Sequence, residues 1–470
     1  MSKKPKTRIL LIHPYGFDVS CVLPLALAYL DSQIDKDRFQ TKIFDCSLRG
    51  ITADSEQFVD ELLEFKPDVV GVSMWSFVYP EGLAILKNTK SILNNVITVV
   101  GGIHASMNYE EVIKDKNVDF LLRGEAEFTF PMLMEKIRDS EDYRNVSGLV
   151  FKDQNNKVIA SGQHTLVENL DDIRRPNYDS IDLAEYTRQG YSFKTKTNKN
   201  APVWLTRGCP YKCQYCSSPD LSGKKIRKHS PEYVTSWINH LYHDRGIRFI
   251  NIIDDQFTFD VPYAKEICKT IKKLNYKDLS FGTPNGVRME RGDTELWSLM
   301  KEAGWKGVII APESGSARTL KRMKKGLDPK VVPEVVKEIK SVGLFVHAFF
   351  MVGYPGETKA DLIDTRNMII DSEVDSFSLF SFQALPGTPV FHTLVENGAI
   401  PVSYTQTSGS VQNVNKNYTT IGLKNVNITM FKVMTFLLVF LRRPLKIIRL
   451  LDYHRFSVIL KQLAGMLRST

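Results

Sequence analysis

The sequence has little cysteine and lacks a long apolar run. Only six cysteines occur among 470 residues and three of them are clustered, which argues against a disulfide-stapled scaffold and for a reducing environment. An apolar run at 431–441 is too short to span a bilayer, which needs about 20 residues. No N-terminal signal peptide is visible, because Lys3, Lys4 and Lys6 lead straight into a strand-like segment. We therefore expect a cytoplasmic protein.

Charge is unevenly distributed along a chain of otherwise ordinary composition. The chain is 43% apolar and 24% charged, and 470 residues are enough for two or three domains. After residue 420 there are nine basic residues and one acidic residue, so this tail carries most of the net charge of +9. Cys21, Cys46 and Cys268 stand alone in the sequence, and we expect them to be small core residues. The basic character therefore belongs to the tail.

The other three cysteines form the densest chemical motif in the chain. Cys209, Cys213 and Cys216 follow a C-x-x-x-C-x-x-C spacing. An odd number of thiols so close together suits a single thiol-binding metal centre rather than disulfide bonds. A cubane iron–sulfur cluster takes four external ligands. Three cysteines would leave one iron open. A zinc site or a redox dithiol is the alternative, although zinc usually has a fourth ligand nearby and the next histidine is His229.

This motif, with an aromatic residue before its last cysteine, resembles that of the radical S-adenosylmethionine (SAM) enzymes. The resemblance implies that the three cysteines hold a 4Fe-4S cluster whose open iron binds SAM. One electron then cleaves SAM to a 5′-deoxyadenosyl radical. It also implies that Tyr215 lies against the adenine, that Asp254 and Asp255 approach the SAM amino group, and that Glu313 and Ser314 lie near its ribose and carboxylate.

The region around this motif predicts a partial barrel. Six apolar strands are expected at 203–206, 249–253, 279–282, 307–311, 345–351 and 376–382. Helical patterns lie between them, and residues 201–395 therefore read as a (βα)6 partial-barrel radical SAM domain. In β/α barrels the active groups lie at the carboxyl ends of the strands. Each expected strand here ends in polar or glycine-containing sequence, and Arg288, after the third strand, is suited to pairing with a carboxylate or phosphate.

The N-terminal region, residues 8–140, predicts a second α/β domain. Continuous β-branched runs at 9–12, 42–44, 69–72, 96–100 and 120–122 alternate with helical patterns, which indicates a doubly wound parallel sheet. Such sheets bind ligands at the carboxyl ends of their strands. The polar and glycine residues at those ends resemble the cobalamin-binding domain that precedes many radical SAM domains. The contacts implied are Ser47, Ser73, Gly101, Gly102, His104, Gly124 and Glu125.

One position departs from the best-known cobalamin carriers. Their D-x-H-x-x-G motif supplies a histidine to cobalt, and the matching stretch here, Asp45 to Gly50, has Ser47 in the histidine place. A serine hydroxyl is a poor cobalt ligand. We therefore expect cobalt without a histidine below it; a nucleotide-like fold that no longer holds cobalamin is the alternative. His104 either contacts the cofactor or is a packed core histidine.

Two further segments complete the expected organisation. Residues 141–200 read as a linker containing a hairpin at 148–161, and residues 396–470 as a mainly helical basic C-terminal region with a loop at 405–420. Three interpretations of the tail compete: an amphipathic face on an anionic membrane, a helical cap packed on the barrel, and nucleic-acid binding. Aromatic stacking groups are sparse there, so no nucleic acid is expected.

The resemblance implies a cobalamin-dependent radical SAM enzyme. The expected reaction is methylation of an unactivated carbon of a small-molecule, lipid or peptide substrate, with methylcobalamin as methyl donor. It needs an external one-electron reductant of the flavodoxin or ferredoxin type. A non-methylating cyclase or lipid-tailoring enzyme on the same architecture is one alternative. A non-catalytic cobalamin-binding or sensing protein is the other.

Overall fold

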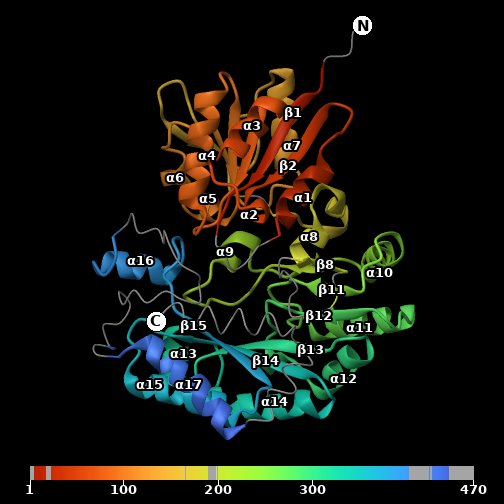
Figure 1. Ribbon diagram of the computed structural model, residues 1–470, viewed down its shortest axis with the longest axis vertical. Helices are drawn as coiled ribbons and strands as arrows, with labels where there is room; N and C mark the ends of the chain where they lie inside the picture. The colour runs from red at the N-terminus through yellow and green to blue at the C-terminus, as the bar shows by residue number, and fades with distance from the viewer. Residues whose placement is uncertain are drawn as a thin grey trace.

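The protein consists of two α/β units, one above the other in Figure 1. The computed structural model describes residues 5–16, 23–164, 166–188, 197, 199–401, 423 and 426–443. The upper unit is N-terminal and the lower unit follows it in the chain. Short elements of the connecting region lie between the two units.

A seven-stranded sheet forms the centre of the N-terminal unit. Its strand order is β2-β1-β3-β4-β5-β6-β7, and β1 to β5 run parallel. The strands are β1 Thr7–His13, β2 Phe39–Asp45, β3 Val69–Ser73, β4 Ile97–Gly101, β5 Phe120–Leu122, β6 Leu149–Lys152 and β7 Val158–Ala160. The helices are α1 Leu25–Gln33, α2 Cys46–Arg49, α3 Glu56–Phe65, α4 Tyr79–Ile92, α5 Ile103–Met107, α6 Tyr109–Val112 and α7 Thr129–Asp139.

Helices cover both faces of this sheet. Leu10 and Ile12 pack in one apolar cluster with residues of α3 and α4, whereas Ile9 and Leu11 pack in another with residues of α1 and α7. Burial on both faces explains why the strand sequences are continuously apolar rather than alternating. The doubly wound parallel sheet predicted from the sequence is confirmed.

The end of this unit differs from the prediction. The expected hairpin is present, but β6 pairs antiparallel with β5, with Phe120 opposite Phe151, and β7 pairs antiparallel with β6. The hairpin therefore extends the N-terminal sheet instead of lying in a linker. Residues 149–151 are buried in the sheet, so the apolar strand that closes the edge belongs to the domain core.

The second unit is a partial barrel built from two three-stranded parallel sheets. Their orders are β12-β11-β8 and β13-β14-β15, and the isolated bridges Phe281–Trp305 and Val287–Ile310 join them. The strands are β8 Asn200–Val203, β11 Phe249–Ile252, β12 Ser280–Gly282, β13 Gly307–Glu313, β14 Phe345–Val352 and β15 Ser376–Ser381. The linking helices are α10 Pro231–Asn239, α11 Val261–Leu274, α12 Thr294–Glu302, α13 Ala317–Arg322, α14 Val332–Ser341 and α15 Lys359–Asp371. Six strands alternate with helices as predicted, although the first begins at Asn200 rather than at 203.

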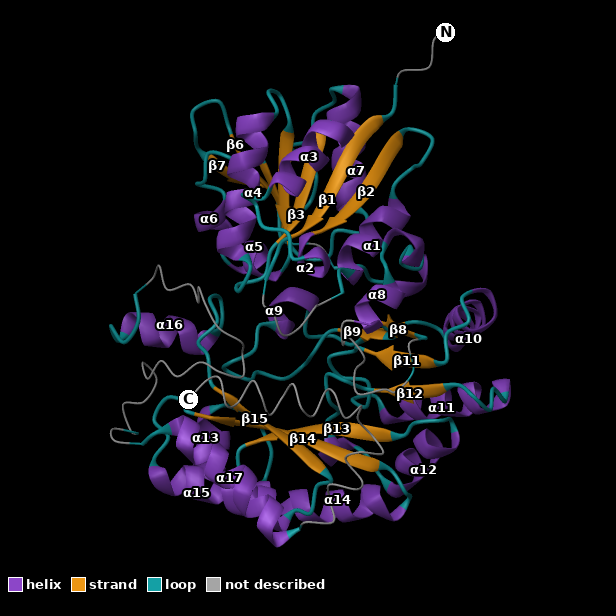
Figure 2. Ribbon diagram, viewed as in Figure 1, coloured by secondary structure: helices purple, strands orange, loops and turns teal. Residues whose placement is uncertain are grey.

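The carboxyl edges of the two units face one another. Figure 2 shows the strands of the upper sheet pointing down toward α9 Ser218–Ser222, which lies between the units. Helix α5 contacts α9. A Cβ atom added to Gly387, after β15, would lie 2.5 Å from Cβ of Met107 in α5. Loops from both carboxyl edges are therefore in direct contact. The remaining short elements are α8 Leu183–Arg188, β9 Thr206–Arg207, β10 Arg227–Lys228 and α16 Pro389–Glu396.

The described part of the tail packs on the barrel. Helix α17, Ile428–Arg442, places Phe436 against Phe377 of β15 with ring centroids 4.5 Å apart. Arg443 lies 3.5 Å from Glu373 after α15. This packing fits the helical-cap interpretation for residues 428–443. The expected loop at 405–420 and the amphipathic segment at 445–467 lie outside the described residues.

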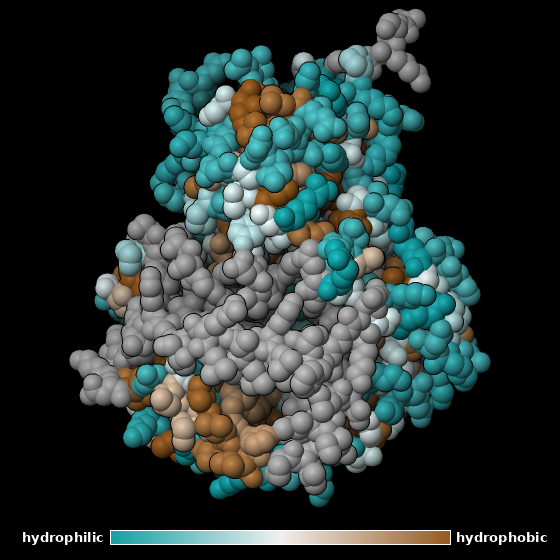
Figure 3. Space-filling view, viewed as in Figure 1, coloured by the Kyte–Doolittle hydropathy of each residue, from teal (hydrophilic) through white to brown (hydrophobic). Residues whose placement is uncertain are grey.

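The outer face of α17 is apolar. Figure 3 shows a brown patch where α17 lies, and its exposed side chains include Met430, Met434, Leu437 and Leu441. Within the described residues, no helix is long and apolar enough to cross a membrane. Membrane association through the tail stays a prediction.

Candidate functional site

The cysteine loop leaves the short strand β9 through a glycine that no other residue could replace without strain. Gly208 has φ +102°, and a Cβ atom there would lie 2.2 Å from the carbonyl oxygen of Lys225. The amide of Cys209 donates to the carbonyl oxygen of Gly223 at 2.9 Å. The segment 223–226 thus packs against the base of the loop. Glycine is required here by both its backbone conformation and the close approach.

The three cysteines carry free thiols in partly buried positions. Cys209 is buried, and Cys213 and Cys216 are half-buried. Burial raises the pKa of the Cys209 thiol to about 11, so binding a metal must displace its proton. Among the described residues, no three His, Cys, Asp or Glu side chains are grouped to hold one metal ion.

A hydrogen-bonded network lies beside the loop. The Tyr215 hydroxyl donates to Oε1 of Glu313 at 3.0 Å, and Nζ of Lys325 donates to the same oxygen at 3.0 Å. Glu313 has φ +68°, a left-handed conformation that is strained for a non-glycine residue. Burial and the Glu313 carboxylate raise the pKa of Tyr215, so it remains a neutral donor. The sequence predicted Tyr215 and Glu313 but not Lys325, which no motif marked.

Arg288 braces the other side of the loop. Its guanidinium lies 3.6 Å from the ring centroid of Tyr211, within the loop, and 3.2 Å from Glu290. It also donates to the carbonyl oxygen of Lys325 at 2.7 Å. The charge of Arg288 is therefore engaged by the carboxylate of Glu290 and by the ring of Tyr211 in the cysteine loop.

The two adjacent aspartates have different environments. Asp254 is 2% exposed, and its oxygens accept from the Leu205 amide at 2.7 Å and from the Thr206 hydroxyl at 2.8 Å. Burial raises its pKa to about 7. Asp254 thus joins the segment after β11 to the start of the cysteine strand, and its expected approach to the SAM amino group stays a prediction. Asp255 is only half-buried, 3.4 Å from the hydroxyl of Ser218, and remains the candidate for a ligand contact.

Ser314 is also engaged within the protein. Its hydroxyl lies 3.0 Å from that of Thr365 and accepts from the Ser316 amide at 3.1 Å, and the residue is fully buried. Its hydroxyl fixes the turn after β13, and its expected position near the SAM ribose and carboxylate stays a prediction. The neighbouring Glu313 stands at the strained end of the same strand.

Glycines and small polar residues line the carboxyl edge of the N-terminal sheet, as predicted. Gly101 ends β4, and Gly102 follows with φ +92° and a virtual Cβ atom 2.6 Å from the Met74 carbonyl oxygen. The Gly124 amide donates to Ser106 Oγ at 3.1 Å. Ser73 ends β3.

Ser47 lies on α2, the short helix that follows β2. Asp45 begins this helix by accepting from the Leu48 amide at 3.0 Å. Ser47 is half-buried at this edge. It therefore shares the sheet edge with Ser73 and the glycines, as the resemblance implied.

His104 is a packed histidine. It is 4% exposed, its Nδ1 lies 3.0 Å from the hydroxyl of Ser76, and its ring stacks on Tyr79 with centroids 4.2 Å apart. Burial lowers its pKa to about 4, so the ring is neutral at pH 7. Of the two alternatives drawn from the sequence, these contacts fit the packed core histidine.

Glu125 forms part of a buried ion-pair cluster between the units. Its two oxygens accept from Arg227 at 2.6 and 2.7 Å, and Arg207 lies 3.6 Å away. Arg207 also pairs with Glu127 at 2.6 Å. We name Glu125, Glu127, Arg207 and Arg227 the domain clamp. Glu125 is thus bound to the base of the cysteine loop, whereas the sequence interpretation placed it against a cofactor.

Several buried polar groups near the barrel's strand ends have no partner in the described structure. Both side-chain heteroatoms of Asn251 and of Gln383 are buried without a hydrogen bond, as are Oγ1 of Thr283 and Oε1 of Gln256. Buried polar atoms are nearly always satisfied in folded proteins. The ends of β11, β12 and β15 therefore offer donors and acceptors suited to a polar ligand such as a nucleoside.

Two domain families match the chain at these two units. Residues 19–134 match the B12 binding domain, and residues 204–369 match the Radical SAM superfamily. This chain is a radical SAM enzyme with a B12-binding domain. The match to the second family begins at Trp204 and so includes the cysteine loop, Asp255 and Glu313.

The radical SAM enzyme has similar relatives across most of its length. It is 29% identical over 378 residues to an uncharacterized methyltransferase of Pyrococcus horikoshii, covering 80% of this chain and 79% of the relative. It is 26% identical to the cytidylyl-2-hydroxyethylphosphonate methyltransferase of Streptomyces wedmorensis, covering 84% of each. The structure of the radical SAM methyltransferase TsrM from Kitasatospora setae shares its fold with a TM-score of 0.71 at 18% identity, over 84% of this chain and 77% of that one.

The cofactors of this radical SAM enzyme are a 4Fe-4S cluster, SAM and cobalamin. The residues present fit all three. A three-thiol loop suits a cluster with one open iron, unsatisfied polar atoms at the strand ends suit SAM, and Gly102 lets a broad ligand approach the sheet edge. The chain is similar over most of its length to proteins named as methyltransferases.

Proposed function

We propose that the enzyme methylates an unactivated carbon of its substrate at the interface between the two carboxyl edges. The observation that carries this proposal is the contact between those edges, where α5 meets α9 and Met107 meets Gly387. When bound, the cluster and SAM supply a radical that abstracts hydrogen, and cobalamin supplies the methyl group. Proximity of the two cofactor sites is what such a reaction requires.

We assign the binding roles as follows. Cys209, Cys213 and Cys216 hold the cluster, and Glu313, supported by Lys325 and Tyr215, presents an anionic group toward SAM. Asp255 is the second carboxylate on that side. On the opposite side, the edge formed by Ser47, Ser73, Gly101, Gly102 and Gly124 receives cobalamin.

Contact between the two units would also limit side reactions in this proposal. Helix α5 of the N-terminal unit contacts α9, which follows the cysteine loop. Closure would exclude water from a radical site, where quenching competes with methyl transfer. The substrate class, whether small molecule, lipid or peptide, stays open in this proposal.

A test that needs no substrate uses the SAM-to-cobalamin methyl transfer. The reconstituted enzyme with bound cobalamin is incubated without oxygen with a reductant and SAM carrying a trideuterated methyl group. We expect S-adenosylhomocysteine in solution and the label in the corrin fraction by mass spectrometry. The Gly102→Ala variant, whose Cβ atom would meet a backbone carbonyl, should lose both signals together with bound cobalamin.

Two other outcomes distinguish the alternatives. If 5′-deoxyadenosine forms but the corrin fraction never gains the label, the enzyme carries out radical chemistry without methylation, as a cyclase would. If replacing the three cysteines by alanine leaves the protein's function intact, the protein is a cobalamin-binding or sensing protein. Either result would overturn the methyl-transfer proposal.

A further inference from the structure

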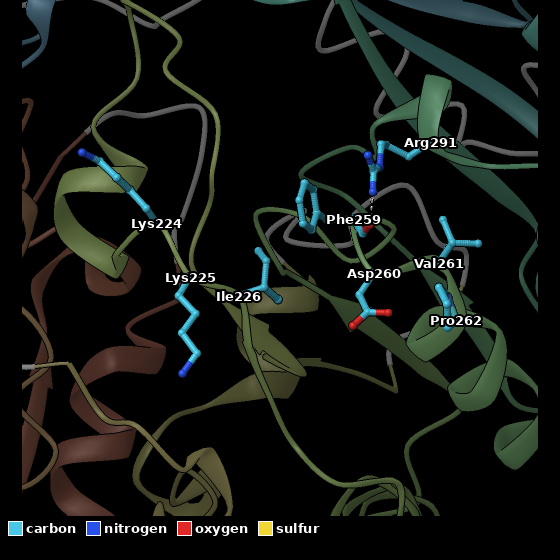
Figure 4. Close-up of a pocket in the computed structure, with 8 residues that line it drawn as sticks. All are labelled: Lys224, Lys225, Ile226, Phe259, Asp260, Val261, Pro262 and Arg291. Carbon is cyan, nitrogen blue, oxygen red and sulfur yellow. Dashed lines mark hydrogen bonds between the residues drawn. The ribbon is translucent and has the colours of Figure 1, made fainter.

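A basic surface lies directly behind the cysteine loop. A cavity of about 480 Å³ is lined by residues of two segments, 224–226 and 259–262, together with Arg291. Figure 4 shows Lys224 and Lys225 on one side of this cavity, and Asp260 and Arg291 on the other. Lys212, exposed within the cysteine loop itself, adds a further cation. We name Lys212, Lys224, Lys225 and Arg291 the basic collar.

Both walls of the cavity touch the loop that holds the cysteines. On one wall, the Lys225 carbonyl oxygen lies against Gly208, and the Gly223 carbonyl oxygen accepts from the Cys209 amide at 2.9 Å. On the other wall, the ring of Phe259 packs edge-on against Tyr211 with centroids 5.8 Å apart. The backbone next to one wall of the cavity is therefore hydrogen-bonded directly to Cys209.

The positive charge of the collar is largely uncompensated. Asp260, the acidic residue of the cavity, pairs with Lys228 at 2.6 Å. Lys225 lies 3.7 Å from Glu168, but both side chains are about four-fifths exposed (81% and 78%), so the pair is weak. In the described part of the chain, Lys212 and Lys224 have no carboxylate at salt-bridge distance.

The exposure of these cations points to a protein partner rather than to a small anion. In a site for phosphate or a similar ion, several buried hydrogen-bond donors converge on the ion. The collar cations are instead solvent-exposed and lie on three chain segments. Spread charges of one sign raise association rates with an oppositely charged surface and fix its orientation.

We propose that the basic collar is the docking surface for an acidic one-electron carrier, a flavin or iron–sulfur protein. This inference rests on the proposed radical SAM function, because only a loaded cluster would use the electron. In the step, one electron leaves the reduced carrier and enters the cluster. The carrier is oxidised by one electron, the cluster is reduced by one, and no bond or proton is exchanged.

The test compares two charge-reversal variants of the full-length, reconstituted enzyme. Lys224→Glu with Lys225→Glu changes the collar without touching a cysteine or a buried side chain. Lys306→Glu with Lys337→Glu makes the same change of charge on exposed residues, beside the amino end of β13 and on α14. Reduced acidic flavodoxin is the probe, and both its binding and the bleaching of the cluster absorbance are measured.

At low salt we expect the collar variant to bind flavodoxin about tenfold more weakly than wild type and its cluster to be reduced about tenfold more slowly. Both differences should shrink at high salt. Photoreduced deazaflavin, a small reductant that needs no docking surface, should reduce wild type and both variants equally. The control variant should behave as wild type with flavodoxin.

Two results would overturn the proposal. One is a collar variant that binds flavodoxin and is reduced by it like wild type, and the other is an equal loss in the control variant. Failure of the proposed function looks different, because deazaflavin would then bleach the wild-type cluster without yielding 5′-deoxyadenosine.

Discussion

Removing one charge from the domain clamp should loosen the base of the cysteine loop. In Glu125→Gln the side chain keeps its volume but no longer neutralises Arg227, whose side chain is 3% exposed, while that of Glu125 is 8% exposed. Removing one partner of a buried ion pair costs about 3–5 kcal/mol, because the other charge stays buried. Arg207 keeps its bond to Glu127, so we expect the lower end, about 3 kcal/mol.

Hydrogen exchange measures this loss at the loop itself. The reporter is the Cys209 amide, which is bonded to the Gly223 carbonyl oxygen and lies two residues after Arg207. A loss of about 3 kcal/mol in opening free energy corresponds to roughly hundredfold faster exchange. The matched control is Glu111→Gln, which breaks the 3.0 Å pair with Lys114 whose side chains are 74% and 66% exposed. Exchange at Cys209 that is equal in the two variants would refute the structural role of Glu125.

Three smaller perturbations follow from the same structure. Gly208→Ala should reduce iron bound after reconstitution, since φ +102° and a backbone carbonyl 2.2 Å away impose about 1–3 kcal/mol of strain, whereas Gly246→Ala, with open space around it, should keep its iron. Tyr215→Phe removes a hydrogen bond to Glu313 and should weaken SAM binding about tenfold by titration at unchanged iron content; unchanged affinity would separate this network from SAM. Burial lowers the pKa of His104 from 6.5 in the unfolded chain to about 4 in the fold. The neutral ring therefore contributes up to about 3 kcal/mol to the free energy of unfolding above pH 6.5, and this contribution is lost as the pH falls toward 4. Urea unfolding should show a shallower acid loss in His104→Gln; parallel curves would contradict the assignment.

The fold could be predicted well because local sequence patterns indicate its strands and helices. Continuous β-branched runs marked the parallel strands. The hairpin at 148–161 was predicted as a unit, but its partner was not. Strand β6 pairs with β5 through a long-range contact, and the apolar sequence at 149–151 does not indicate which sheet edge it joins.

A site residue can be predicted from sequence where a motif fixes both the residue type and the spacing. The three cysteines have that property, and their binding of a cluster stays a prediction. Asp254 and Asp255 are neighbours with the same chemistry, yet Asp254 is buried against Thr206 whereas Asp255 faces Ser218 of α9. Successive side chains of an extended segment point to opposite sides, and the sequence does not say which side faces the site. The domain clamp joins Glu125 to Arg227, 102 positions away, and no sequence pattern indicates such a pair.

The account depends most directly on the cluster held by Cys209, Cys213 and Cys216. The decisive measurement is iron content together with 5′-deoxyadenosine production, after oxygen-free reconstitution and addition of SAM and a strong reductant. We predict about four irons per chain and steady release of 5′-deoxyadenosine for the wild type, and neither for the triple alanine variant. A wild-type protein that binds no iron, or binds it and never cleaves SAM, would contradict the account.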